Sequence, residues 1–404
     1  MKNSHPALIS NALTLAANTG GRFVLVLVLA VVAIRSAQAQ SLQVLYSFPA
    51  SSNNGVPEAG VIRDSAGNLY GDTFGGYACA LPTFGLGSLF EIDSSGQETD
   101  LHNFSGPDGA CPFGELLRDR EGNLFGTTFA GGVDNYGTVF KVDRGGVETV
   151  LHSFPSPGQS SDGCTPEAGL VQDKAGNLYG TTTMCGAFEM GTVFEIDQTG
   201  TESILHSFKG DDGSSPMGLI IDANGNLYGI ASTVLYKISA RGRFTVLHKF
   251  ADCHSTFGSP LLDKDGNLYG TALCRASAFG IVWKRRKDRT VTVLHKFTGP
   301  EGTYPSDHGL ILDEQRNIYG VAMGGGVFND GTVYKLSADG TITLLHTFTE
   351  ASAAKEGAYP SGRLTMDRKG NLYGTTMLGG EGGIGTVWKL KPCDPRMVLP
   401  GSCR

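Results

Sequence analysis

The sequence is poor in charge, in tryptophan and in long hydrophobic runs. Charged residues make up 18% of its 404 residues, and acidic residues (39) outnumber lysine and arginine (32). An acidic chain without a basic cluster argues against nucleic acid and anionic lipid as partners. The longest apolar run, residues 23–34, has 12 residues, whereas a membrane-spanning helix needs about 20. We therefore expect no membrane span in the mature protein.

The sequence also lacks the motifs of several enzyme classes. It contains no G-x-S-x-G, H-E-x-x-H or P-loop motif. It has neither a C-x-x-C pair nor a His/Cys cluster with zinc spacing. The two tryptophans, Trp283 and Trp388, form no repeated motif of the kind expected for a quinone-dependent dehydrogenase. We predict no cofactor and leave a bound divalent cation open.

The first 39 residues have the composition of a targeting segment. Lys2 and Arg22 precede the apolar run, and Ala37-Gln38-Ala39 follows it. A basic start, a short apolar core and an A-x-A site are typical of a cleavable secretory signal peptide. We predict a secreted, periplasmic or cell-surface protein, with an uncleaved anchor as the alternative.

Glycine is abundant, at 58 residues, and most of it belongs to a repeat. There is no Gly-X-Y period, which excludes collagen, and so much glycine disfavours long helices. The tag G-N-L-Y-G recurs with small variations, and an aspartate precedes each of its asparagines by four residues. The seven asparagines are Asn68, Asn123, Asn177, Asn226, Asn267, Asn317 and Asn371.

Each unit of about 50 residues contains four strand-like segments: G-L-I-x-D, N-L-Y-G-T-T, G-T-V-F-K-I-D and T-V-L-H-S-F. The D-x-x-G-N linker between the first two is a tight-turn sequence. Four strands per 40–50 residues is typical of a β-propeller. We predict an all-β fold over residues 41–390, a seven-bladed β-propeller with four antiparallel strands per blade.

The order of the segments predicts how the ring closes. The chain starts with a lone fourth segment, residues 42–48, and ends with a unit that lacks its fourth segment, at residues 386–390. The N-terminal strand would therefore complete the last blade and leave no open sheet edge. Residues 391–404 would form a cysteine-containing C-terminal tail, and we expect a monomer.

The D-x-x-G-N-L-Y-G-T-T, G-T-V-F-K-I and L-H-x-F segments resemble the choice-of-anchor tandem-repeat (GloVer) family of exported bacterial repeat proteins. The resemblance covers residues 41–390 in seven copies. Members often carry a C-terminal anchoring segment, and residues 391–404 depart from that pattern because they contain no hydrophobic anchor. The resemblance implies an exported repeat protein and supplies no catalytic residues.

In a propeller, the fourth-to-first and second-to-third connections lie on the same side, called the top face below. The fourth-to-first loops repeat an acid-G-x-x-P pattern, and its acids are candidate ligand-binding residues for a cation or sugar hydroxyls, or else turn formers. They are Asp108, Asp162, Asp212, Glu301 and Glu356. Aromatic residues in the top loops could stack on sugar rings. These are Phe113, Tyr136, Phe257, Tyr304, Phe328 and Tyr359.

Two histidines outside the repeat, His254 and His308, fall in such loops of adjacent blades. With Asp307 they are candidates for metal binding or acid–base work, or are solvated loop residues. The repeated histidines of the fourth segment lie on the circumference, so they cannot converge on one metal, and we interpret them as structural. The Asp/Asn pairs of the tight turns receive the same interpretation.

All eight cysteines follow the signal segment, and an even number in an exported chain favours disulfides. Cys164 and Cys185, and likewise Cys253 and Cys274, are 21 residues apart and join two top loops of one blade. We predict these two bonds, together with Cys79–Cys111 and Cys393–Cys403.

The function expected from the sequence is a non-catalytic binding scaffold. Its ligand would be a glycan, a peptide or a partner on the cell surface or outside the cell. The alternative is a polysaccharide-active enzyme, a lyase or hydrolase, with its site in the central depression of the top face; a purely structural envelope protein is a third hypothesis.

Overall fold

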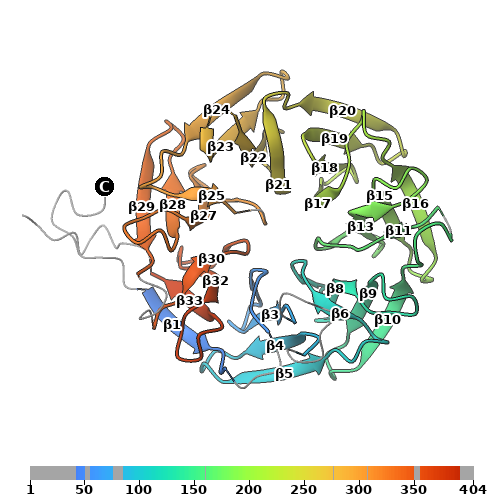
Figure 1. Cartoon of the computed structure of the whole chain (residues 1–404), viewed down its shortest axis with the longest axis horizontal. Coiled ribbons are helices and arrows are strands. Elements are labelled where there is room, and N and C mark those ends of the chain that lie inside the picture. The colour runs from blue at the N-terminus through green and yellow to red at the C-terminus, as the bar shows by residue number, and fades with distance from the viewer. Residues whose placement is uncertain are drawn as a thin grey trace, which may run out of the picture. The chain divides into compact units, whose positions relative to one another are not determined.

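In the computed structural model, the described parts of the seven repeats form seven antiparallel sheets of four or five strands, and one extra two-stranded ladder, that follow one another around a ring (Figure 1). The structure describes residues 42–50, 55–75, 85–159, 161–275, 277–306, 308–349 and 355–391. The chain divides into two compact units, Met1–Ser36 and Ala37–Arg404, and every described residue belongs to the second. The predicted signal peptide and almost all of the predicted tail lie outside the described residues. None of the described segments is a helix long and apolar enough to cross a membrane.

The strands group into blades as follows. Blade 1 contains β2 (Ile62–Arg63), β3 (Leu69–Thr73), β4 (Ser88–Ile92) and β5 (Glu98–Asn103). Blade 2 contains β6 (Ala110–Pro112), β7 (Leu117–Arg118), β8 (Leu124–Ala130), β9 (Thr138–Val142) and β10 (Glu148–Ser153). Blade 3 contains β11 (Gly163–Cys164), β12 (Val171–Gln172), β13 (Leu178–Thr182), β14 (Met184–Cys185), β15 (Thr192–Ile196) and β16 (Glu202–Ser207). Blade 4 contains β17 (Pro216–Ile221), β18 (Leu227–Ala231), β19 (Val234–Ile238) and β20 (Phe244–Lys249).

The last three blades continue the ring. Blade 5 contains β21 (Cys253–Leu262), β22 (Leu268–Cys274), β23 (Ser277–Arg285) and β24 (Val291–Lys296). Blade 6 contains β25 (Thr303–Pro305), β26 (Ile311–Leu312), β27 (Ile318–Gly324), β28 (Thr332–Leu336) and β29 (Ile342–Thr347). Blade 7 contains β30 (Ala358–Pro360), β31 (Thr365–Met366), β32 (Leu372–Leu378), β33 (Thr386–Leu390) and β1 (Leu42–Ser47).

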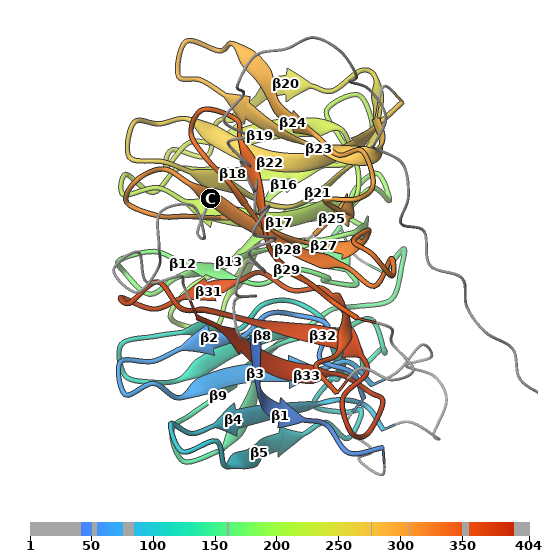
Figure 2. The same ribbon diagram turned by 90° about the vertical axis from the view of Figure 1, so that its left-hand side faces the viewer.

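The predicted ring closure is confirmed. β1 pairs antiparallel with β33, with Leu42 opposite Leu390 and Ser47 opposite Thr386. In Figures 1 and 2, β1 lies at the outer edge of blade 7, beside β33. Since the first and last strands of the repeat region pair in one sheet, β33 is covered by β1 and the ring closes, unlike a linear repeat array.

An aromatic pair between each two neighbouring blades forms the core. The phenylalanine that follows each outer strand is almost fully buried and packs on the aromatic residue in the third strand of the next blade, as Phe154 does on Phe194 at 5.3 Å between ring centroids. The other pairs lie 5.0–5.9 Å apart: Phe48–Phe90, Phe104–Phe140, Phe208–Tyr236, Phe250–Trp283, Phe297–Tyr334 and Phe348–Trp388. The two tryptophans are thus core residues, as predicted.

The glycine that ends each G-N-L-Y-G tag makes room for these rings. Gly180 lies opposite Phe194 in the β13–β15 ladder, and a Cβ at Gly180 would overlap the ring. The same overlap exists at Gly71, Gly126, Gly229, Gly270, Gly320 and Gly374. Part of the glycine excess therefore results from close approach of a ring to the backbone.

The outer strands keep some of their apolar side chains exposed. Val246, Val293 and Leu344 are 37%, 47% and 42% exposed. Each outer strand also contains a register shift next to its histidine, or next to Tyr46 in β1, as between Val150 and His152 of β10. Wedge-shaped blades diverge toward the rim, so the last strand keeps one face partly in water.

Candidate functional site

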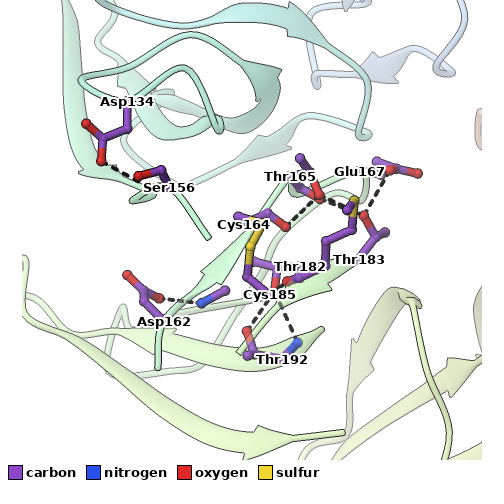
Figure 3. The surroundings of a disulfide bond; sticks show 12 residues. Asp134, Ser156, Asp162, Cys164, Thr165, Glu167, Thr182, Thr183, Cys185 and Thr192 are labelled. Atoms are coloured by element: carbon purple, nitrogen blue, oxygen red, sulfur yellow. Dashed lines mark hydrogen bonds between the residues drawn. A yellow bond between two sulfur atoms is a disulfide. The ribbon is translucent and has the colours of Figure 1, made fainter. Parts of the chain in front are cut away.

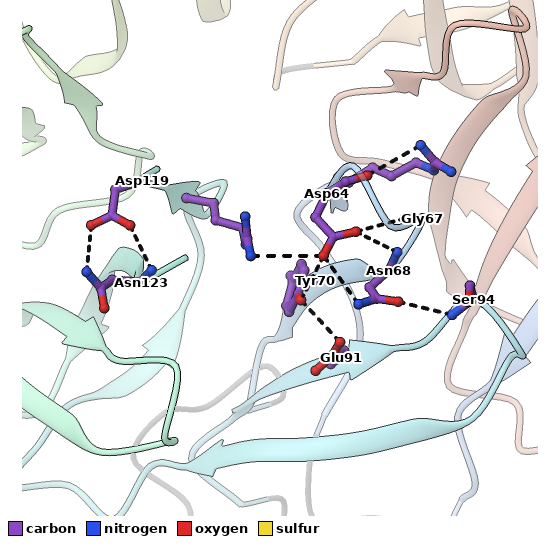
Figure 4. A network of polar contacts seen from close by, with 10 residues as sticks. Asp64, Gly67, Asn68, Tyr70, Glu91, Ser94, Asp119 and Asn123 are labelled. Carbon is purple, nitrogen blue, oxygen red and sulfur yellow. Dashed lines mark hydrogen bonds and ion pairs between the residues drawn. The ribbon is translucent and has the colours of Figure 1, made fainter. Parts of the chain in front are cut away.

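The repeated aspartates of the tight turns are structural, as predicted. Asp64 accepts hydrogen bonds at Oδ1 from the amides of Gly67 (2.8 Å) and Asn68 (2.9 Å), and at Oδ2 from the Tyr70 hydroxyl (3.3 Å) (Figure 4). Burial acts to raise the pKa of Asp64, but these hydrogen bonds hold it below its ordinary value. The Asp119–Asn123 turn in the same view repeats the pattern.

The five acids of the top loops each contact the histidine of their own outer strand. His152 Nε2 lies 2.9 Å from Asp162 Oδ2. The equivalent distances are 3.0 Å for His102–Asp108, 3.1 Å for His206–Asp212, and 3.3 Å for both His295–Glu301 and His346–Glu356. The structure thus places these acids near the rim and pairs each with a histidine, which favours their interpretation as turn formers; ligand binding by them remains a prediction.

Two of the predicted disulfides are confirmed. Cys164–Cys185 joins β11 to β14 (Figure 3), and Cys253–Cys274 joins the first residue of β21 to the last residue of its partner strand β22. Cys111 is also disulfide-bonded. Its predicted partner, Cys79, lies outside the described residues, as do Cys393 and Cys403. The confirmed bonds place both kinds of loop on the same face.

An aromatic cleft of about 480 Å³ lies on the top face over blades 5–7. Its wall is formed by Phe279, Thr303, Tyr304, Pro305, Met323, Gly324, Asn329 and Tyr359. Tyr304 is 54% exposed and Phe279 42%, so the rings are presented to solvent rather than buried in the core. Exposed aromatic residues around a concavity are typical of ligand sites.

The two tyrosines of the cleft are held by an unusual backbone conformation. Tyr304 (φ 53°) and Tyr359 (φ 56°) are in the left-handed region, each directly before a proline. The same position is left-handed in three other blades, at Cys111, Thr165 and Ser215. The conformation therefore belongs to the fold, whereas the two tyrosine side chains are specific to blades 6 and 7.

The other predicted aromatic residues do not join this cleft. The Phe113 ring centroid lies 5.8 Å from that of His308, a residue that lines one of the cavities described below. Tyr136 packs on the hydrophobic core. Phe328 is 52% exposed and directly precedes Asn329 of the cleft wall. The side chain of Phe257 is outside the described part of the structure.

The axis of the ring contains two cavities of about 940 and 420 Å³, lined by the innermost strands. Glu115 and Arg363 line both cavities and form an ion pair at 3.8 Å. Burial raises the pKa of Glu115, and the charges of Arg363 and His308 oppose that effect. His308 lines the smaller cavity, but His254 is an exposed residue of β21 and lines neither cavity. Asp307 lies outside the described residues, so the predicted trio stays a prediction.

The sequence interpretation missed a buried acid, Asp72, which lies near Glu58 and Glu115. Asp72 is 1% exposed, and both of its carboxylate oxygens lack a hydrogen-bond partner in the described structure. Burial, followed by the nearby charges of Glu58 and Glu115, raises its pKa well above the ordinary value. The fold therefore disfavours the ionised form of Asp72.

The signal that could have revealed these residues is a departure from the repeat. Four units have threonine where Asp72 stands, at the first position after the tag glycine: Thr127, Thr181, Thr271 and Thr375. Counting four residues back from each turn aspartate gives glycine in four units, whereas blades 2 and 7 have Glu115 and Arg363. In a repeat protein, such single deviations identify residues with a local role.

The family model of the Gloeobacter/Verrucomicrobia repeat matches residues 30–234 and 231–397. With its seven-bladed propeller, the chain belongs to this repeat family. No curated protein matches the sequence.

Solved structures confirm the propeller class. A streptogramin B lyase structure has a TM-score of 0.60 at 14% identity and covers 87% of this chain and 97% of its own. Virginiamycin B lyase from Staphylococcus aureus has a TM-score of 0.62 at 12% identity and covers 87% of this chain and 99% of its own. The extracellular domain of a putative hybrid two-component system from B. thetaiotaomicron has a TM-score of 0.56 at 14% identity, over 87% of this chain and 41% of that chain. At these identities the similarity shows the fold alone.

Proposed function

We propose that this protein is a non-catalytic, extracellular binding propeller that holds a glycan in the aromatic cleft of blades 5–7. The observation that carries the proposal is the pair of tyrosines, Tyr304 and Tyr359, that line one cleft from a rigid left-handed backbone. Sugar rings present apolar C–H faces, and flat aromatic rings fixed by the scaffold match them without losing much side-chain entropy.

The polar groups of the cleft support a sugar rather than a purely apolar ligand. Thr303 and Asn329 lie in its wall beside the rings. The side-chain oxygen of Asn329 accepts a hydrogen bond from the amide of Gly325 (2.9 Å), which fixes the side chain. A few oriented polar groups among aromatic walls are what hydroxyl recognition requires.

An extracellular location is part of the proposal. The disulfides favour an oxidising compartment, and a propeller with the same fold forms an extracellular domain in B. thetaiotaomicron. We propose that residues 1–39 are a cleaved signal peptide that delivers the propeller to the periplasm, the cell surface or the medium.

The experiment is a glycan array followed by titration of the best ligand. The substitutions Tyr304→Ser and Tyr359→Ser remove one ring each. Serine can adopt the left-handed backbone conformation needed there, because Ser215 does so at the same position of blade 4. Each should weaken the Kd about tenfold, since one lost stacking contact is worth roughly 1.4 kcal/mol.

The matched control is Phe188→Ser, which removes a ring that is 54% exposed on blade 3, away from the cleft. Its Kd should equal that of the unchanged protein. If the protein binds a glycan and neither tyrosine substitution weakens the Kd, the cleft is not the binding site.

The second candidate function is a polysaccharide-active enzyme. Three neighbouring acids at the inner end of blades 1 and 2 favour it. Asp72, Glu58 and Glu115 are close enough for their charges to interact, and an acid with a raised pKa beside a second carboxyl group is what glycoside cleavage needs. Cleavage of an array ligand during prolonged incubation, detected by mass spectrometry, would support this candidate over binding alone.

A further inference from the structure

The outer strands of neighbouring blades meet in seams, and three of these seams contain glutamate. The first residue of the outer strand faces the histidine, or Tyr46, of the preceding blade. In blades 1, 2 and 3 it is Glu98, Glu148 and Glu202, and in the other four blades it is apolar: Phe244, Val291, Ile342 and Leu42. The same structural position is thus polar on one side of the ring only.

The seam between blades 1 and 2 brings three ligand-type side chains together. The ring nitrogen of His102 and carboxylate oxygens of Asp108 and Glu148 all lie within 4.8 Å of one another. His102 Nε2 is 3.0 Å from Asp108 Oδ2. All three residues are partly buried, and Glu148 Oε1 is a buried atom without a hydrogen-bond partner in the described structure.

We propose that His102, Asp108 and Glu148 bind a divalent transition-metal ion of the Zn²⁺ type between β5 and β10. Two ligands at about 2.0–2.1 Å from zinc are roughly 3.3 Å apart in a tetrahedral sphere, close to the separation found between His102 and Asp108. An ion there gives Glu148 Oε1 the partner it lacks and neutralises two carboxylates in a half-buried place.

The surroundings of the site orient two of its ligands. Asp108 Oδ1 accepts hydrogen bonds from the amide (2.8 Å) and hydroxyl (2.9 Å) of Ser105, which leaves Oδ2 directed at the histidine. The His102 ring packs edge-on against Phe104, with 4.9 Å between centroids. Groups that hold ligands in place in this way increase metal affinity.

Other seams show that the outer-strand histidine has no need of an ion for folding. At the seam of blades 3 and 4, Phe244 takes the place of the glutamate and stacks on His206 at 3.7 Å. The donor set at blades 1 and 2, one imidazole and two carboxylates, suits Zn²⁺ or Mn²⁺ better than Ca²⁺ or Mg²⁺, which prefer oxygen ligands.

The test is isothermal titration of the purified, chelator-treated protein with ZnCl₂ at pH 7.5, with CaCl₂ as the comparison. We expect Zn²⁺ binding that raises the unfolding temperature, and weaker binding of Ca²⁺. Glu148→Gln should weaken Zn²⁺ binding at least about tenfold. Glu148→Phe, which copies the Phe244 seam, should weaken it as much while the protein stays folded.

The matched control is Glu202→Gln, which changes the corresponding glutamate of the next seam, beside His152 and Asp162. It should leave the affinity of the His102 site unchanged. The proposal is overturned if the unchanged protein shows no Zn²⁺-dependent stabilisation, or if Glu148→Gln binds Zn²⁺ as tightly as the unchanged protein does.

Discussion

At the scale of single residues, the molecule distinguishes repeated polar groups from solitary ones. Three of the four threonines after the tag glycine donate from inside one blade to a carbonyl of the next, as Thr127 Oγ1 does to Ala168 O (2.9 Å) and Thr375 Oγ1 to Ala59 O (3.0 Å). The Thr181 hydroxyl has no such partner among the described residues. Asp72 occupies this position in blade 1 without a comparable bond. Most threonines at this position therefore hold neighbouring blades together, whereas Asp72 buries a whole carboxyl group without a partner.

We predict that Asp72→Thr raises the free energy of unfolding at pH 7 by about 1 kcal/mol or more, because it restores a hydroxyl donor and removes a buried acid. The raised pKa means that the folded protein disfavours the ionised form. The native Asp72 is therefore least costly below the ordinary pKa of 3.8 and becomes costly as the pH rises. Urea denaturation at pH 4 and pH 7 should show a gain that grows with pH. A loss of stability at both pH values would contradict this assignment.

At the scale of strands, the two disulfides support ladders of different length. Cys164 and Cys185 belong to β11 and β14, which share only two residue pairs. Cys253 begins β21 and Cys274 ends β22, and these two strands pair, with two register shifts, as far as Leu262 and Leu268. The first disulfide is therefore the main link between its two strands, whereas the second adds to a ladder that is stable without it.

We predict that replacing Cys164 and Cys185 together by serine opens the top loops of blade 3 to limited proteolysis and lowers stability by about 3 kcal/mol, the chain-entropy value for a loop of this size. The control is the double serine variant of Cys253 and Cys274, which loses similar stability but keeps its loops protected by the β21–β22 ladder. Equal proteolysis of both variants would show that the length of the strand ladder does not protect the loops.

At the scale of the whole molecule, the ring has a polar and an apolar side at its rim. Burial, followed by the charges of Asp108 and Asp162 respectively, raises the pKa of Glu148 and of Glu202 to about 7. Both lie at seams between blades, so their ionisation acts on the contacts that close the ring. The seams with Phe244, Val291 and Ile342 have no such group at this position.

We predict that the metal-free protein becomes less stable as the pH rises from 5 to 8. A carboxyl with a folded pKa near 7 stabilises the fold fully below its unfolded pKa, near 4.5, and loses that contribution as the pH rises through about 7. Because both side chains are only partly buried, we expect about 1 kcal/mol or less from each. Thermal unfolding in EDTA of the Glu148→Gln/Glu202→Gln variant should show a flatter pH profile; an unchanged slope would contradict the assignment.

The sequence by itself determined the architecture, because it repeats one set of local rules seven times. Turn aspartates, a glycine facing an aromatic ring and a lone first strand specify the blade, its core and its closure through short-range and pairwise contacts. The repeat also predicted the Cys164–Cys185 and Cys253–Cys274 bonds. Cysteines with the same spacing at the same positions of the repeat occupy the same places in their blades.

Only the tertiary structure decided which side chains from different blades meet. The cleft of Tyr304 and Tyr359, the Glu115–Arg363 pair and the His102–Asp108–Glu148 trio each join residues whose distance depends on how wedge-shaped sheets pack around an axis. The register shift beside each outer-strand histidine also changes the alternation that the sequence predicts, as at Val150 and His152. Local patterns carry no information on these contacts, because packing between blades, rather than the turn chemistry within one, sets the distances.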